Sequence, residues 1–259
     1  MTAVATGRRL DWLEGREVGV ATAVRAETSG PGDDIQVELT DGHVLEVQVK
    51  HGLTKSARLW DALETLAQGL TADPELRAIL LVSPDSSSTI RRDLANDLAR
   101  MASGRTDGLK AISREFAGRL EDRGLCAEET ADRLRIVTLD PDHARQTMRR
   151  DLEDLCATPA AARAAAFALE NDAAHLIERR GRRDLRTIVQ TLDSAEIAWR
   201  LDASARAATL ARPQLGRVKR RPALKSSVSN SRCPSTRDGY RSRRCGPMRR
   251  PSQSTCPKQ

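Results

Sequence analysis

Aromatic residues are scarce in this chain. They make up 2% of its 259 residues, so the sequence does not support a stacking platform for single-stranded bases. No apolar run approaches the ~20 residues that a membrane-spanning helix needs, and the first residues lack the apolar stretch of a secretory signal. We therefore expect a cytoplasmic protein that does not act at a membrane.

Several common catalytic and metal-binding motifs are also missing. The sequence contains no GxxxxGK[ST] phosphate loop, no GxSxG nucleophile motif and no CxxC pair. Its five cysteines are an odd number without metal-ligand spacing, which argues against a disulfide framework and against a zinc site. The sequence therefore supports neither ATP hydrolysis by this chain alone nor hydrolysis by a serine nucleophile.

Charge is divided unevenly along the chain. The formal charge is +7, but residues 1–211 hold 29 basic and 35 acidic residues, whereas residues 212–259 hold 14 basic residues and one acidic residue. The body is therefore acidic and only the tail is basic. Consequently, the high pI of the whole chain gives no information about the ligand of the body.

The spacing of apolar residues predicts an alternation of strands and helices. Residues 8–27 fit either a helix or, over 18–24, a strand. Farther along, strands are expected at 35–39, 44–49, 78–82 and 135–139, and helices at 56–70, 89–101, 109–123, 143–156, 159–179 and 183–198. This order predicts an α/β fold in which a mixed sheet flanked by helices continues into a helical module.

The tail changes character. It is rich in Arg, Ser and Pro and has no apolar periodicity, so we expect residues 206–259 to be disordered. Its composition also resembles translation of a GC-rich gene in the wrong frame, with the original frame lost near residues 203–212. The alternative is a genuine basic tail that binds nucleic acid non-specifically.

The segment VELTDGHVLEVQVK, residues 37–50, predicts a hairpin with polar residues at alternate positions. A two-residue Asp41-Gly42 turn pairs Val37 with Glu46 and puts four polar residues on one face away from the turn. These residues are Asp33, Glu46, Gln48 and Lys50. A one-residue change in loop length brings Asp34 to this face instead, because a register slip reverses every side chain.

This polar group has a chemical use. An acid at a strand start, opposite a strand that ends in amide, any residue, lysine, offers two oxygen ligands to Mg²⁺, which retains several waters. A bound metal lowers the pKa of a water and stabilises charge on a phosphate under attack. The lysine ammonium can orient that water or neutralise charge that develops on the phosphate.

The pattern Asp33 or Asp34, followed by Gln48-Val49-Lys50, resembles the active-site signature of restriction-endonuclease-like nucleases, the PD-(D/E)XK group. The segment GDDIQVEL–DG–VLEVQVKHGL is also similar to double-stranded-DNA nuclease domains at the N-terminus of large bacterial anti-phage ATPases. The resemblance extends over about residues 15–200. Further segments that carry it are LWDALETLAQGL, AILLVSPDSSSTI, SGRTDGLKAI and ERRGRRDLRTI.

The resemblance implies a DNA endonuclease that uses Mg²⁺ or Mn²⁺. It assigns the metal carboxylate to Asp34 or Asp33, the second metal ligand to Gln48, and the catalytic lysine to Lys50. Many members have glutamate where this chain has Gln48, which weakens the expected metal affinity; Glu46, on the same face, is the residue that could compensate. Members often carry a further acid on the first helix, for which the candidates are Glu17 and Glu27.

The resemblance also implies an organisation and a set of partners. We expect a nuclease-like α/β domain at 8–140, a helical connector at 141–205 and the tail at 206–259. The expected partners are DNA, an ATPase or sensor, and in one reading further copies of the chain. The alternative is a catalytically inactive α/β module for docking or oligomerisation, in which Lys50 is a solvated strand-end cation and Gln48 lies on an exposed edge strand.

Two smaller features have open interpretations. The serines at 86–88 are expected to cap the helix that begins near Thr89, or to contact a phosphate. Residues 178–184, ERRGRRD, are expected to form a helix–Gly–helix junction with solvated arginines, or to bind a backbone phosphate. His51 and His43 are expected to be solvent-facing loop and turn residues.

Overall fold

The protein is described here by a computed structural model. It describes residues 1–6, 9–13, 16–26 and 34–200, and for residues 9–13 and 16–18 it describes the backbone alone. Several predictions lie outside the described residues: those for Asp33 and Glu27, and those for the tail at 206–259 with its disorder and its frame. The described residues belong to one compact unit, and the domain boundary near residue 140 stays a prediction.

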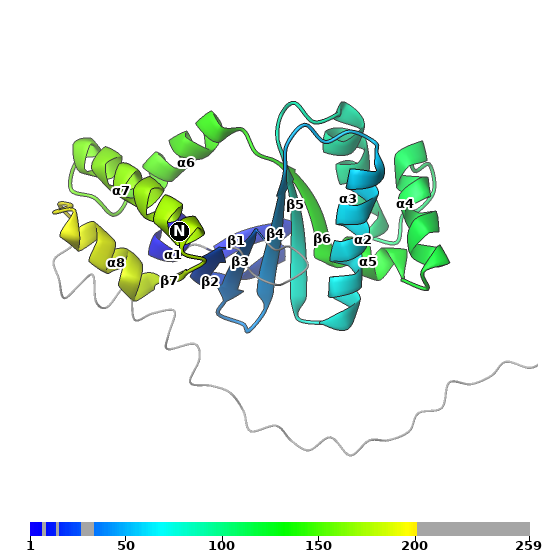
Figure 1. Cartoon of the computed structure of the whole chain (residues 1–259), viewed down its shortest axis with the longest axis horizontal. Helices are drawn as coiled ribbons and strands as arrows, with labels where there is room; N and C mark the ends of the chain where they lie inside the picture. The colour runs from blue at the N-terminus through cyan, green and yellow to red at the C-terminus, as the bar shows by residue number, and fades with distance from the viewer. Residues whose placement is uncertain (7–8, 14–15, 27–33, 201–259) are drawn as a thin grey trace, which may run out of the picture. The chain divides into compact units, whose positions relative to one another are not determined.

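A mixed β-sheet forms the centre of the fold (Figure 1). Six strands lie in the order β1 to β6, and β7 pairs with β2 beside this path. The pairs β1–β2, β2–β3 and β3–β4 are antiparallel, whereas β4–β5 and β5–β6 are parallel. The strands are β1 (Arg9–Leu13), β2 (Arg16–Ala26), β3 (Ile35–Leu39), β4 (Val44–Lys50), β5 (Leu76–Val82), β6 (Leu134–Thr138) and β7 (Arg182–Asp184).

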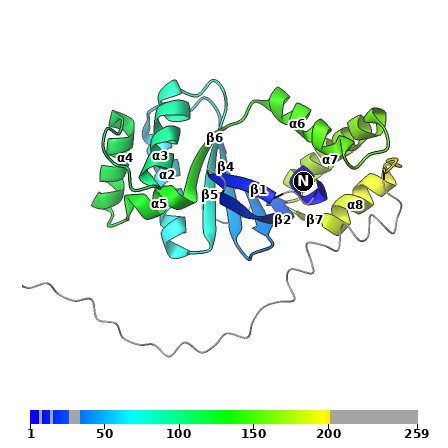
Figure 2. The same cartoon turned by 180° about the vertical axis from the view of Figure 1, so that it is seen from behind.

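Helices cover both faces of this sheet, as the view from behind in Figure 2 also shows. One face packs on α2 (Ala57–Ala72), η1 (Thr89–Leu94), α3 (Ala95–Met101), α4 (Ala111–Asp122) and α5 (Ala127–Arg133). The other face packs on α1 (Thr2–Thr6), α6 (Pro141–Glu153), α7 (Pro159–Glu178) and α8 (Leu185–Ser194). No helix of the described residues is long and apolar enough to cross a membrane.

The expected α/β class and most of the expected elements are confirmed. Within residues 8–27, the strand interpretation is right, because Arg16–Ala26 forms β2. Its run of β-branched and small residues, VGVATAV, favours a strand over a helix. The short elements α1, α5 and β7 are additions that the sequence pattern did not predict, since elements of three to seven residues carry too few periods to stand out.

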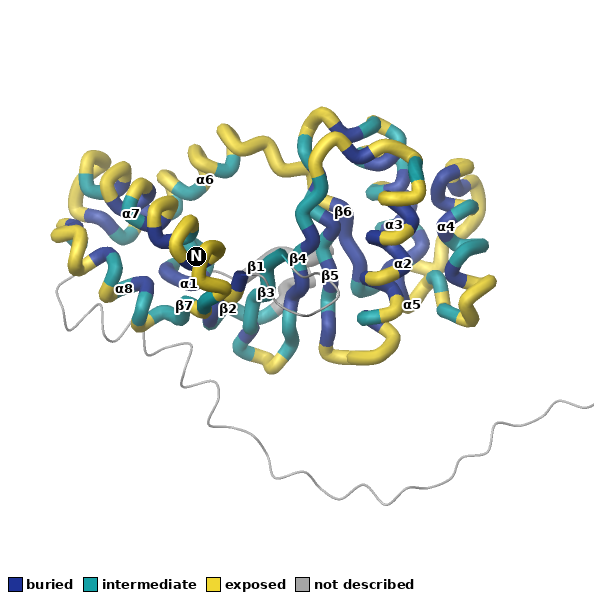
Figure 3. Tube along the Cα trace, viewed as in Figure 1, coloured by how far each residue is buried: buried dark blue, intermediate teal, exposed yellow. Residues whose placement is uncertain are grey.

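The main core lies between the parallel strands and α2 to α5. The apolar side of α2 is fully buried as its spacing predicts, and Leu59, Leu63 and Leu66 have 0% exposure. Strand β5 contributes Ala78 and Leu80 to the same core. The buried parts of the chain, dark blue in Figure 3, follow the strands and the inner sides of these helices. This packing fixes the position of α2 against β5.

The junction at residues 178–184 differs from the expected helix–Gly–helix turn. Residues Arg182–Asp184 form β7, which pairs with β2, and Asp184 then caps α8 by accepting a hydrogen bond from the Thr187 N–H. Two of the four arginines form ion pairs: Arg182 donates to Glu38 at 2.8 and 2.9 Å, and Arg183 donates to Asp172 at 2.8 to 3.0 Å. Arg179 and Arg180 are exposed, as expected. The two ion pairs stabilise the fold, and phosphate binding there has no support.

Glu38 is one of several acids whose pKa is lowered in the fold, together with Asp97 and Asp184. Hydrogen bonds from Arg182 and Arg25 hold its pKa at about 2, below the ordinary 4.5. The carboxylate thus contributes stability above its unfolded pKa, and this contribution is lost as the pH falls from about 5 to about 2. We expect Glu38→Gln to lower the free energy of unfolding by about 1–2 kcal/mol at neutral pH and to weaken the dependence on pH.

Urea unfolding at several pH values measures this effect. The matched control is Glu121→Gln, because Glu121 is exposed on α4 and should change little. An unchanged pH profile in the Glu38→Gln variant would contradict the assignment.

Candidate functional site

The β3–β4 hairpin has a three-residue loop. The Leu39 N–H donates to the His43 carbonyl at 3.0 Å, and Gly42 adopts φ = +93° at the end of the loop. The expected two-residue turn is therefore wrong, although Asp41 and Gly42 do lie in the turn. The reason is Thr40, which β2 holds by two hydrogen bonds: its N–H donates to the Val20 carbonyl at 2.9 Å, and its Oγ1 accepts from the Val20 N–H at 3.0 Å.

The longer loop shifts the register by one residue. Gln36 lies opposite Glu46, and Val37 lies opposite Leu45. The face predicted from the shorter turn, which grouped Val37 with Glu46, is therefore wrong. The register instead puts positions 34 and 36 of the first strand on the face of Glu46, Gln48 and Lys50. Val37 and Leu45 belong to the core of the opposite face.

Asp34 lies directly beside the Gln48-Val49-Lys50 segment. Its Oδ2 atom accepts a hydrogen bond from the Val49 N–H at 2.6 Å. This short contact anchors the carboxylate against the backbone of β4, between the two side chains that the sequence selected. Of the two candidate aspartates, Asp34 is the one that the described structure brings to this position, and Asp33 lies outside the described residues.

Glu46 occupies the same face but has a partner of its own. It is 2% exposed, and its Oε1 accepts a hydrogen bond from Gln36 Nε2 at 2.7 Å. Buried carboxylates need such donors, because burial without a partner destabilises the charge. Glu46 does not line the cavity described below. Glu46 therefore links β4 to β3 through this hydrogen bond.

Gln48 has a buried amide oxygen without a partner. The residue is 8% exposed, and among the described residues its Oε1 has no hydrogen-bond donor. A buried acceptor left unpaired costs about 1–3 kcal/mol, so it needs an explanation such as a bound ion or ligand group. This oxygen is the atom that the sequence pattern assigned to a metal.

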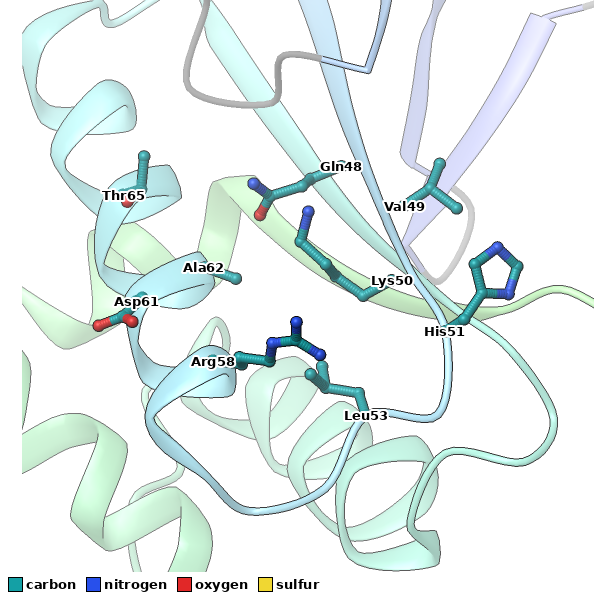
Figure 4. A pocket seen from close by; sticks show the side chains of 9 residues that line it. All are labelled: Gln48, Val49, Lys50, His51, Leu53, Arg58, Asp61, Ala62 and Thr65. Atoms are coloured by element: carbon teal, nitrogen blue, oxygen red, sulfur yellow. The ribbon is translucent and has the colours of Figure 1, made fainter.

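A cavity of about 500 Å³ lies between the end of β4 and the beginning of α2. The strand and the loop after it contribute Gln48, Val49, Lys50, His51 and Leu53, and α2 contributes Arg58, Asp61, Ala62 and Thr65. Figure 4 shows the side chain of Lys50 reaching toward the amide of Gln48, with the guanidinium of Arg58 facing them from the helix. The cavity therefore combines two cations, Lys50 and Arg58, one carboxylate, Asp61, and the unpaired oxygen of Gln48.

The loop after β4 is fixed by serines of the loop after β5. The Gly52 N–H donates to Ser83 Oγ at 2.9 Å, and the Leu53 N–H donates to Ser86 Oγ at 3.0 Å. Ser86 is 2% exposed. The expected cap has the right position, since Ser88 is the N-cap residue of η1, but its side chain makes no capping bond. Ser83 and Ser86 hold the loop that joins Lys50 to α2.

Of the remaining metal-ligand candidates, Glu27 lies outside the described residues and Glu17 is described by its backbone alone. Glu17 lies in β2, paired with Asp11 of β1, so the expected helical position for it is wrong. Within the described ranges, no group of three or more His, Cys, Asp or Glu side chains could hold a metal ion. The oxygens of Asp34 and Gln48 nevertheless fit Mg²⁺, because this ion retains several waters and uses few protein ligands.

Three cavity residues were not selected from the sequence. Arg58, Asp61 and Thr65 lie three and four residues apart, with the small Ala62 between them. This spacing puts them on one face of a helix. The signal was therefore present as a polar stripe on the amphipathic segment 56–70, opposite its leucines.

Comparison with known proteins gives a likeness in fold. No protein-family model and no curated protein matches the chain. A structure of the Acinetobacter baumannii Cap4 SAVED/CARF-domain containing receptor, with the cyclic trinucleotide 2'3'3'-cAAA, matches 74% of the chain with 12% identity and a TM-score of 0.51. The Moraxella osloensis Cap4 receptor matches 75% with 13% identity and a TM-score of 0.48.

The chain spans less than half the length of these structures, 42% and 44% respectively. At such low identity, the likeness to the Acinetobacter protein concerns the fold alone. It is a likeness in the α/β arrangement of a sheet and its helices, and the chain is structurally similar to part of that receptor.

Proposed function

We propose that the cavity between β4 and α2 is the active site of a metal-dependent endonuclease that hydrolyses phosphodiester bonds in DNA. The observation that carries the proposal is the buried, unpaired oxygen of Gln48, which lines a cavity together with Lys50. The carboxylate of Asp34 is bound to the N–H of Val49, between these two residues, although Asp34 is not itself a lining residue. An acid, an amide oxygen and a lysine at one strand end match the residue types that this chemistry needs.

Asp34 and Gln48 would hold Mg²⁺ or Mn²⁺. The Val49 N–H fixes one carboxylate oxygen of Asp34, and burial fixes the amide of Gln48. A bound divalent ion supplies a water of lowered pKa and stabilises negative charge on the phosphate. Because Gln48 is neutral, most of the charge that attracts the ion comes from Asp34.

Lys50 would act on the reacting groups. It is partly exposed at the end of β4 and lines the cavity, so its ammonium can donate to the attacking water or to a phosphate oxygen. A cation at this point stabilises the charge that grows on the phosphate in the transition state. The serine-fixed loop after β4 limits the freedom of the strand end that carries it.

We also propose a defence context for this activity. It is supported by the resemblance of the sequence to nuclease domains of anti-phage ATPases. The Acinetobacter protein of similar fold is named as a receptor and binds a cyclic trinucleotide in its structure. The proposal is that a sensor or ATPase, attached or separate, controls cleavage by this chain.

A plasmid-nicking assay tests the proposed function. The purified full chain, in excess over supercoiled DNA, should produce nicked and then linear DNA with Mg²⁺ or Mn²⁺, and EDTA should stop the reaction. An absence of cleavage with both metals would sink the nuclease assignment.

The second candidate is the inactive docking or oligomerisation module. The specific observation in its favour is Gln48, where an active site of this type commonly has a charged glutamate. This candidate predicts no cleavage with either metal, and it also predicts no difference between wild-type protein and variants at the cavity. The nicking assay therefore separates the two candidates.

A further inference from the structure

Helix α2 presents a polar face to the cavity and an apolar face to the core. Arg58, Asp61 and Thr65 line the cavity, whereas Leu59 and Leu63 are fully buried. All three polar side chains are exposed, as expected for the solvent side of an amphipathic helix. Their place in the cavity lining, opposite Gln48 and Lys50, is what makes them candidates for contact with a ligand.

Arg58 lies where the helix itself disfavours a cation. It is the second residue of α2, the first turn holds no acid, and Ser56 makes no side-chain capping bond. The N-terminus of a helix carries partial positive charge, so a cation there is destabilising and an anion is stabilising. Lys50 adds a second cation to the same cavity. Asp61 supplies one carboxylate to the lining, and a bound anion would neutralise the positive charge that remains.

The two cations of the cavity are not neutralised by ion pairs within the described part of the fold. The pairs formed among the described residues include neither Arg58 nor Lys50. Some arginines of the fold form ion pairs, such as Arg182 with Glu38 and Arg183 with Asp172. The exposed Arg149 resembles Arg58 in forming none among the described residues, but it lies outside the cavity. Arg58 and Lys50 are thus available for a ligand.

We propose that Arg58 binds a phosphate of the DNA backbone and positions it next to Lys50 and Gln48. The inference rests on the proposed function and adds a substrate-binding residue to it. A guanidinium donates two parallel hydrogen bonds to phosphate oxygens, and Figure 4 shows this group directed toward the side chains of Lys50 and Gln48. The unpaired, nine-tenths-buried oxygen of Gln48 independently indicates that this cavity takes a ligand.

Chemical modification of arginine tests this contact one residue at a time. The full chain is treated with phenylglyoxal in EDTA, with and without a short DNA duplex, and peptide mass spectrometry reports the extent of modification at each arginine. DNA should protect Arg58 about fivefold or more, because the bound phosphate occupies its donors. Arg149 on α6 is the matched control, since it is exposed and does not line the cavity. Equal modification of Arg58 with and without DNA would overturn the proposal.

Kinetics distinguish binding from a structural role. Arg58→Ala should raise the KM for plasmid DNA about tenfold with a smaller change in kcat, and Arg58→Lys should recover part of the loss because it keeps the charge. Arg149→Ala should leave both parameters near the wild-type values. An Arg58→Ala variant with wild-type KM would contradict the inference.

The outcomes for Arg58 and for the proposed function are separable. Protection of Arg58 in EDTA, together with no cleavage by the wild-type protein, would defeat the nuclease and keep the DNA contact. Cleavage by wild type, with Arg58 unprotected and Arg58→Ala fully active, would defeat the contact and keep the nuclease.

Discussion

Replacing Lys50 with alanine is expected to reduce the rate of metal-dependent DNA cleavage by about 100-fold or more, the magnitude found when one group that stabilises transition-state charge is removed. Lys50 lies at the end of β4, lines the cavity and is only partly buried. Its removal takes away the ammonium without opening the core, so the free energy of unfolding should change by no more than about 0.5 kcal/mol.

Single-turnover nicking of supercoiled plasmid measures the loss, and urea unfolding confirms that the variant is folded. The matched control is Lys110→Ala, because Lys110 is exposed, precedes α4 and does not line the cavity. If the Lys50→Ala protein cleaves DNA as fast as the wild type, the activity does not come from this cavity. A loss in the Lys110→Ala protein as well would point to damage that is not specific to the site.

Asp34→Asn is expected to slow DNA cleavage by a similar factor. The loss should come from weaker metal binding, not from weaker stabilisation of charge on the phosphate. The amide oxygen of asparagine can still accept the Val49 N–H that Asp34 binds at 2.6 Å, so the strand pairing should survive. The negative charge that attracts the ion is lost, and we expect about 100-fold slower cleavage at low Mg²⁺. Alanine is a poorer test, because it would leave the Val49 N–H unpaired at a cost of about 1–3 kcal/mol.

Titration of the cleavage rate with Mn²⁺ and Mg²⁺ checks this expectation. The metal concentration for half-maximal rate should rise in Asp34→Asn, whereas Asp33→Asn removes the same charge one position earlier and should retain most of the activity. Loss of activity in the Asp33 variant alone would show that the register does not select the metal ligand. Equal losses in both would show that the two charges act together.

The elements of the fold were predictable because they depend on local patterns. The apolar residues of α2 recur at helical spacing, and each of Leu59, Leu63 and Leu66 is fully buried as that spacing requires. The mixed sheet followed from the order of strands and helices. The short strand β7 was not predictable, since its pairing with β2 depends on residues about 160 positions away in the chain.

The choice between Asp33 and Asp34 depended on the length of one turn. Asp-Gly suits a two-residue turn and also the last positions of a three-residue loop that ends in a glycine of positive φ. The sequence of the hairpin does not favour the two-residue turn over the three-residue loop. The decision comes from Val20 of β2, whose backbone holds Thr40 and so draws a third residue into the loop.

By itself, the sequence determined which residue types are present and which of them alternate: an acid before one strand, then Gln48 and Lys50 on the next. Only the tertiary structure decided which of these side chains meet. The neighbouring strand set the register that brings Asp34 to Val49, and serines from the loop after β5 fixed the loop that joins Lys50 to α2, the helix of Arg58. The physical reason is that alternation and helical spacing are local, whereas hydrogen bonds between segments distant in the chain set register and loop position.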